Sequence, residues 1–137
     1  MTEADLLEHL LSNGDLLWSQ MQYWTSVSFG VLIAAHLAAK RLSWIILIGF
    51  VVLYTIFSSY IGQLVKLNLE TIKGIGADLN LLAESGVALS NTSLSFLEHF
   101  PLLNETVVGQ LVRSILGYGL LIITIGYTLY CKFKSEE

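Results

Sequence analysis

Few residues in this chain could do chemistry, and the most suggestive group is the tripeptide Gly117-Tyr118-Gly119 near the carboxyl end. The same tripeptide occurs in potassium-channel selectivity filters, where backbone carbonyls of an extended loop replace the water around the ion. Such a loop must be followed by a second spanning helix. The segment between Gly119 and Lys132 would give only about 18 Å of helix, which is too short to cross a membrane. We therefore expect a helix here rather than a filter.

Small residues at helical spacing form a second group of candidates. In the segment from 114 to 131, Gly117 and Thr124 share one helical face, and Gly119 and Gly126 share the opposite face. A similar ridge repeats every four residues between 23 and 39, at Ser26, Gly30, Ala34 and Ala38. Small residues let spanning helices approach closely. These faces predict helix packing, either within one protomer or between copies of the chain.

Polar side chains interrupt the apolar segment from 42 to 65 in its second half. They form a stripe with one small residue: Thr55, Ser59, Gly62, Gln63 and Lys66. Polar groups at membrane depth face a partner helix or a water-filled cavity. The stripe therefore predicts either hydrogen bonds between helices or the lining of a pore.

Two ionisable residues, His36 and Arg113, lie in or beside the apolar segments. His36 is one helical turn from Lys40, about 6 Å along the axis, so it can reach the lipid headgroups. A proton relay or a ligand role is the alternative for His36. Arg113 is expected to mark the outer membrane interface, with a gating or ion-pair role as its alternative.

Signatures of enzymes, cofactors and metal sites are missing from the sequence. No carboxylate pair, nucleophile–base arrangement or nucleotide-binding loop is evident, and the three histidines are far apart. We expect no catalytic, cofactor-binding or metal-ligating residues. The net charge of −4 and the lack of a basic cluster also exclude nucleic acid as a partner.

The composition places the chain in a membrane. Of its 137 residues, 54% are hydrophobic and 13% are charged, whereas soluble domains carry about 25% charged residues. Apolar runs near 20 residues are typical of membrane spans. The sequence therefore predicts an all-α integral membrane protein with three transmembrane helices, and the lipid bilayer as its first partner.

The positions of basic residues predict the topology. Lys40 and Arg41 leave a turn of two or three residues between the first two spans, which must then form an antiparallel hairpin. Lys132 and Lys134 follow the third span. By the positive-inside rule the amino terminus is outside and the carboxyl terminus inside, in a multi-pass protein of the cell (inner or plasma) membrane. The predicted parts are an outer amphipathic tail 1–15, transmembrane helices 16–39, 42–65 and 110–132, an outer helical segment 66–109 and a cytoplasmic tail 133–137.

The outer segment shows helical patterns of its own. Apolar or small residues recur at helical spacing at Leu69, Ile72, Ile75, Leu79, Leu82 and Gly86, so we expect the second span to continue as an amphipathic helix to about Ala83. Ser95 and Glu98 match a capping box and predict the start of a short helix. Pro101 is expected to end that helix, and Asn104 to cap the last one.

These features favour a homo-oligomeric, pore- or channel-like membrane protein that passes ions or small solutes. Three spans with an outer amino terminus and a basic inner carboxyl end resemble one class of phage holins in topology, which implies pore formation. The alternative is a non-catalytic accessory or regulatory subunit of a larger membrane complex. In that case the outer segment would contact a membrane-protein partner.

Overall fold

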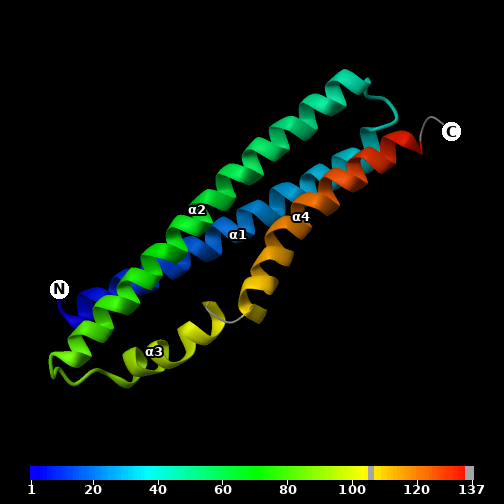
Figure 1. Ribbon diagram of the computed structural model, residues 1–137. Coiled ribbons are helices and arrows are strands. Elements are labelled where there is room, and N and C mark those ends of the chain that lie inside the picture. The colour runs from blue at the N-terminus through cyan, green and yellow to red at the C-terminus, as the bar shows by residue number, and fades with distance from the viewer. Residues whose placement is uncertain (105–106, 135–137) are drawn as a thin grey trace. The chain divides into compact units, whose positions relative to one another are not determined.

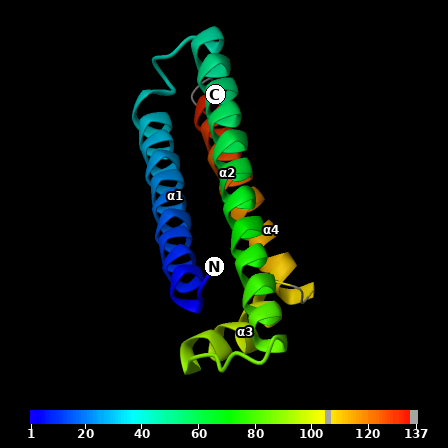
Figure 2. The same ribbon diagram turned by 90° about the vertical axis from the view of Figure 1, so that its left-hand side faces the viewer.

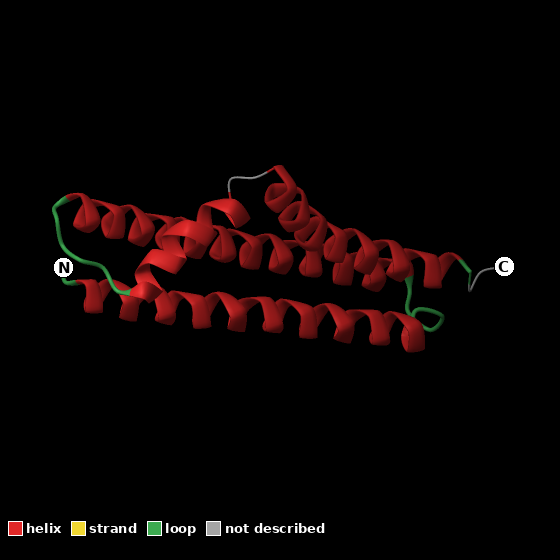
Figure 3. Cartoon of the chain, turned by 90° about the horizontal axis from the view of Figure 1, so that it is seen from below, coloured by secondary structure: helices red, strands yellow, loops and turns green. Residues whose placement is uncertain are grey.

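The protein is all-helical over the residues that the computed structural model describes, 1–104 and 107–134, with the side chains of 101–104, 108–110 and 112–113 left out. Four helices and no strand occur in these ranges: α1 (Glu3–Ala38), α2 (Trp44–Glu84), α3 (Asn91–Asn104) and α4 (Val107–Phe133) (Figures 1 and 3). The all-α prediction is confirmed.

The helices build two compact units. Unit 1 comprises Met1–Ser19 and Leu64–Arg113, and unit 2 comprises Gln20–Gln63 and Ser114–Glu137. Helices α1 and α2 run through the boundary between the units without interruption. Each unit therefore takes one part of α1 and one part of α2, and each has an interior of its own.

A short turn joins α1 to α2 inside unit 2 (Figure 2). The amides of Arg41 and Leu42 both donate to the carbonyl of Ala38, at 2.9 and 3.2 Å. The carbonyl of Ser43 then accepts from Leu47 as α2 begins. This turn closes the hairpin that the Lys40-Arg41 pair predicts.

The interior of unit 1 is apolar. Leu6 of α1 is buried with Ile75 and Leu79 of α2, and four partly buried side chains surround them: Leu10, Leu82, Phe96 and Leu97. Gly76 lies in the same region, where an added Cβ would stand 3.4 Å from the Phe96 ring. Phe96 of α3 therefore lies next to this face of α2, at a distance where an added methyl group would just touch its ring.

Helix α2 ends at Glu84, close to the predicted Ala83. Gly86 has a φ of +86°, a left-handed conformation that glycine adopts without the steric penalty of a Cβ. Its amide donates to Ala83, and the amide of Val87 donates to Leu82. These two bonds form a Schellman motif, which satisfies carbonyls of the last turn.

The first turn of α3 is capped by a residue from the far end of the chain. The Glu3 carboxylate accepts hydrogen bonds from the Ser93 hydroxyl at 2.6 Å and from the Ser90 amide at 2.8 Å. Ser90 also accepts from the Ser93 amide at 3.3 Å, as a helix N-cap does. A carboxylate is favoured at this position by the positive end of the helix dipole. The Glu3 carboxylate thereby links the start of α1 to the start of α3 by hydrogen bonds.

Two sequence predictions for α3 are wrong. The helix begins at Asn91 rather than after Ser95, because Ser90 supplies the cap and Glu3 reinforces it. It also continues past Pro101 to Asn104, although an interior proline removes one amide donor and its ring crowds the carbonyl four residues earlier. The predicted cap role of the Asn104 side chain lies outside the described side chains.

Acidification is expected to loosen α3. The hydrogen bonds from Ser93 and then Ser90 lower the pKa of Glu3 below its usual 4.5. A carboxyl whose pKa is lowered by folding stabilises the fold above its unfolded pKa, and this stability is lost as the pH falls through the folded value. We expect amide exchange in the first turn of α3 to accelerate below about pH 4.5 relative to the rest of unit 1.

The Glu3→Gln variant should show that faster exchange at neutral pH and lose the acid dependence. Glu8→Gln removes the same charge from an exposed position of α1 and serves as the matched control. Hydrogen–deuterium exchange of both variants measures the effect. Equal protection of α3 in the two variants at neutral pH would contradict the cap role.

Candidate functional site

Polar side chains fill much of the interior of unit 2. The Trp24 indole donates to the Ser58 hydroxyl at 3.1 Å, and the hydroxyls of Ser28 and Tyr54 lie 2.6 Å apart. Ser28 also donates to the Trp24 carbonyl at 2.8 Å. All four side chains are buried. They join α1 to α2 by two hydrogen bonds one turn apart.

These four residues are absent from the candidates that the sequence pattern suggests. The signal that could have found them is the hairpin itself: Trp24 and Ser58 are equally distant in sequence from Arg41, and so are Ser28 and Tyr54. In an antiparallel pair with a tight turn, residues equidistant from the turn face each other. The hydrogen bonds follow from that register.

The surface of unit 2 is largely apolar, while its interior combines apolar and polar side chains. Large exposed side chains occur on all three helical segments: Phe29, Ile33, Leu37, Ile45, Ile48, Phe50, Leu53, Ile56, Ile115, Ile122 and Ile123. Thr124 and Thr128 of α4 are by contrast buried. Soluble proteins seldom expose so many large apolar side chains together, because water disfavours apolar surface.

The Thr124 side chain is completely buried. Its hydroxyl has no hydrogen-bond partner among the described residues, and its carbonyl accepts from Thr128 at 2.7 Å. Gly117, on the same helical face, lies beside Trp24, where an added Cβ would stand 3.7 Å from the indole. The face that contains Gly117 and Thr124 therefore packs inside unit 2.

The opposite face of α4, which contains Gly119 and Gly126, does not pack against another helix among the described residues. Gly126 is exposed and an added Cβ there would meet nothing within 4 Å. Gly119 is partly buried, and an added Cβ would contact only Ile115 of its own helix. Inside the described part of unit 2, this face is left without a neighbouring helix.

The ridge on α1 also points away from the interior. Ser26, Gly30 and Ala34 are exposed and Ala38 is partly buried, whereas Ala35 of the same helix is 5% exposed. An added Cβ at Gly30 would meet nothing within 4 Å. The ridge is thus a smooth outer surface of unit 2 rather than a contact within it.

The members of the polar stripe on α2 differ in their exposure. Thr55 is half-buried and donates to the Val51 carbonyl at 2.8 Å, which satisfies its hydroxyl within its own helix. Gly62 is also half-buried, while Ser59 and Gln63 are exposed. Two members of the stripe therefore lie on the outside of unit 2.

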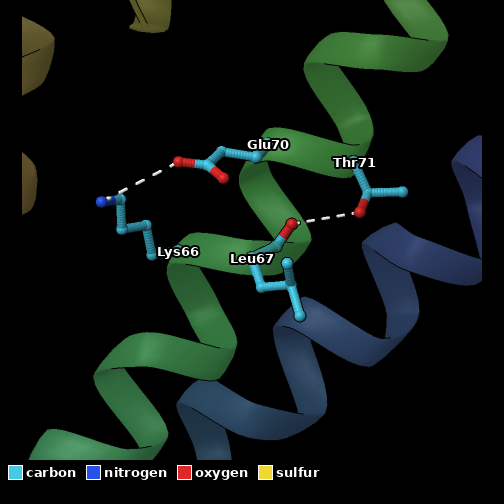
Figure 4. Close-up of polar contacts among 4 residues, drawn as sticks. All are labelled: Lys66, Leu67, Glu70 and Thr71. Carbon is cyan, nitrogen blue, oxygen red and sulfur yellow. Dashed lines mark hydrogen bonds and ion pairs between the residues drawn. The ribbon is translucent and has the colours of Figure 1, made fainter.

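Lys66, the last member of the stripe, belongs to unit 1. Its ammonium lies 3.9 Å from the Glu70 carboxylate one turn further along α2 (Figure 4). Both side chains are exposed, and such pairs contribute only about 0.3–0.5 kcal/mol. In this structure Lys66 is a surface residue of α2.

His36 contacts α4. Its Nδ1 lies 2.8 Å from the Tyr127 hydroxyl, and the two rings stack with their centroids 6.3 Å apart. The contact joins two helices near the end of unit 2 that contains the α1–α2 turn. The predicted role of Arg113 falls on a side chain outside the described ones.

Basic residues gather at that same end of unit 2. Lys40 and Arg41 are exposed in the turn, and Lys134 is exposed after the last turn of α4. Trp44 links the two regions, because its ring lies 5.0 Å from Phe133 and 5.8 Å from the Lys132 ammonium. The described part of unit 2 contains no aspartate or glutamate.

Two helices are long and apolar enough to cross a membrane: α2, and α4 from Ser114 to Phe133. Only 22% and 11% of their most apolar windows are buried, unlike the core helices of soluble proteins. Helix α1 does not reach the same hydropathy, since polar residues such as Gln22, Ser28 and His36 interrupt it. Among the described residues, no group of three His, Cys, Asp or Glu side chains could hold a metal ion.

Comparisons of this chain with protein families, with curated proteins and with solved structures found no match.

Proposed function

We propose that the protein is an integral membrane protein with three spans, formed by the three helical segments of unit 2. The observation that supports this most is a largely apolar surface over an interior that contains hydrogen-bonded polar side chains. The polar residues that lower the hydropathy of α1 include Ser28 and His36, which contact Tyr54 and Tyr127 on neighbouring helices. A spanning helix tolerates polar side chains when neighbouring helices satisfy them.

The lengths of the segments support the same proposal. Unit 2 includes α1 from Gln20, α2 to Gln63 and α4 from Ser114. Each segment has about 20 residues and therefore spans about 30 Å, which equals the hydrocarbon thickness of a bilayer. The remainder of α2 would continue as a helix beyond the membrane, in unit 1.

The charges of the two units support an outer amino terminus and an inner carboxyl terminus. Every charged residue that the structure describes in unit 2 is basic and lies at the end with the α1–α2 turn. By the positive-inside rule this end faces the cytoplasm of a cell (inner or plasma) membrane. Unit 1 contains most acidic residues of the chain and would lie outside.

Within this frame the protein is proposed to act as a homo-oligomeric pore or channel for ions or small solutes. The α1 ridge supports self-association, because a smooth strip of small residues faces outward where a second helix could approach. Exposed Ser59 and Gln63 support a polar path, since side chains of this kind are costly against lipid and favoured against water.

The second candidate is an accessory subunit of a larger membrane complex. A groove of about 390 Å³ in unit 1 supports this second candidate. Its lining is mainly apolar, with one carboxylate. The lining residues are Met1, Leu6, Asp78, Leu81, Leu82 and Ser85. A partner protein with an apolar side chain could occupy this groove, and no ion flux would then be expected from the isolated protein.

The Gly30→Leu variant tests the pore proposal, because a large side chain on the ridge keeps a second α1 at a distance. In liposomes it should weaken self-association by about tenfold or more, equivalent to about 1.4 kcal/mol, and reduce ion flux in parallel. Gly49→Leu is the matched control, since Gly49 is also exposed in unit 2 and also has nothing within 4 Å of an added Cβ.

Photobleaching counts in single liposomes and fluorescent ion indicators provide the two readouts. A wild-type oligomer that stays impermeable under varied voltage would contradict the pore and favour the accessory subunit. A monomeric wild-type protein would contradict self-association.

A further inference from the structure

The basic end of unit 2 has exposed cations from two segments of the chain and an aromatic contact that joins these segments. Three exposed cations come from two separate segments, Lys40 and Arg41 from the α1–α2 turn and Lys134 from the end of α4. A fourth, Lys132, is 7% exposed and lies over the Trp44 ring. Trp44 stands between the segments and holds them together through Phe133. The cations are therefore brought together by packing and not by sequence alone.

Among the described residues, unit 2 offers no carboxylate to the three exposed cations Lys40, Arg41 and Lys134. The described part of this unit has no acidic side chain, and the next acidic residues in the sequence, Glu136 and Glu137, lie outside the described residues. The ion pair between Lys66 and Glu70 belongs to unit 1. The described part of this end is therefore positively charged, which favours an anion.

We propose that this end of unit 2 binds the phosphate group of an anionic phospholipid in the cytoplasmic leaflet. The surface consists of Lys40, Arg41 and Lys134, with Trp44 as the aromatic side chain between them. The inference rests on the three-span proposal, which places this end at the headgroup level. The exposed turn supplies positive charge and hydrogen-bond donors, which arginine and lysine use to bind phosphate.

Lipid is the favoured source because aromatic residues surround the cations. Tyr130 lies beneath the Lys134 ammonium at 5.9 Å, and Trp44 and Phe133 pack together. Aromatic rings with neighbouring lysines are typical of the membrane interface, where one side meets headgroups and the other meets acyl chains. Each cation near an anionic surface increases the affinity about fivefold.

Quenching of Trp44 by brominated lipids tests the proposal. The full-length protein is placed in nanodiscs of phosphatidylcholine that contain a minor fraction of either brominated phosphatidylglycerol or brominated phosphatidylcholine. Quenching that disappears in Trp44→Phe is assigned to Trp44. We expect the anionic lipid to quench Trp44 at least about twofold more than the zwitterionic lipid at equal fraction.

Charge variants identify the residues responsible. The triple variant Lys40→Gln, Arg41→Gln, Lys134→Gln should abolish the difference between the two lipids, and Lys40→Arg, Arg41→Lys, Lys134→Arg should preserve it. The variant Lys66→Gln, Lys73→Gln removes two exposed cations of unit 1 and should also preserve it. Persistence of the difference in the triple glutamine variant would overturn the assignment.

Other outcomes of the quenching experiment distinguish a failure of lipid binding from a failure of the three-span proposal. Equal quenching by both lipids would overturn lipid binding while leaving the three-span arrangement intact, because Trp44 would still lie at the bilayer. Loss of the difference on adding inorganic phosphate, but not on adding chloride at equal ionic strength, would overturn the lipid source and favour a free anion. Absence of quenching by either lipid would contradict the three-span proposal itself.

Discussion

Trp24→Ala is expected to lower the free energy of unfolding of unit 2 by about 3–5 kcal/mol, the usual cost of truncating a buried tryptophan. Trp24 is only 6% exposed, donates to Ser58 on α2 and lies against Gly117 on α4. Its removal leaves a cavity between three helices and a buried hydroxyl without its donor. Denaturant unfolding in mild detergent micelles, followed by far-ultraviolet circular dichroism, measures the loss.

Two variants separate the parts of this effect. Trp24→Phe keeps most of the ring but removes the indole donor, so it should cost about 0.5–2 kcal/mol. Trp18→Ala truncates a tryptophan that is 66% exposed on the same helix, and should cost under about 1 kcal/mol. Equal losses in Trp24→Ala and Trp18→Ala would contradict the packing described for unit 2.

Leu79→Ala is the corresponding test of unit 1 and should cost about 2–5 kcal/mol. Leu79 is fully buried in α2, in one cluster with Leu6 of α1 and Ile75. Because Phe96 of α3 packs on the same cluster, loss of Leu79 should also release α3. Leu81→Ala is the matched control, since Leu81 is two residues away and 62% exposed.

Hydrogen–deuterium exchange of α1, α2 and α3 gives the local readout. In Leu79→Ala, faster exchange should be confined to Met1–Ser19 and Leu64–Arg113, because unit 2 has a separate interior. Exchange that increases equally in both units would show that they unfold as one body and would contradict separate interiors. A similar stability loss in Leu81→Ala would contradict the burial of Leu79.

The sequence predicted helices well because their signals are local. Ile72, Ile75 and Leu79 recur at helical spacing and are all buried, and α2 ends within a residue of the predicted position. The start of α3 differs from the prediction because Ser90, and not Ser95, caps the helix. The choice of Ser90 over Ser95 depends on Glu3, which is almost ninety residues away in the sequence.

Side-chain contacts between helices were predictable only in part. Gly117 and Thr124 were expected on one packed face, and the structure places them against Trp24 and inside unit 2. The pairing of Ser28 with Tyr54 is absent from the sequence predictions, although their equal distance from Arg41 in the hairpin indicates it. The ridge around Gly30 packs against nothing in the described part of unit 2, so its predicted contact between copies involves a second chain.

The side of the membrane on which the amino terminus lies tests the three-span proposal most directly. If α1 crosses the membrane, the amino terminus and the basic end of unit 2 lie on opposite sides. If only α2 and α4 cross, they lie on the same side. Single cysteines distinguish the two arrangements, because Cys131 is the only cysteine of the chain and Ser12 is exposed on α1.

The measurement labels intact cells with a membrane-impermeant maleimide. Ser12→Cys in a Cys131→Ser background should react without permeabilisation, whereas Cys131 in the wild-type chain should react only after it. Labelling of Cys131 in intact cells, or protection of the cysteine at position 12 until the membrane is opened, would contradict three spans with an outer amino terminus.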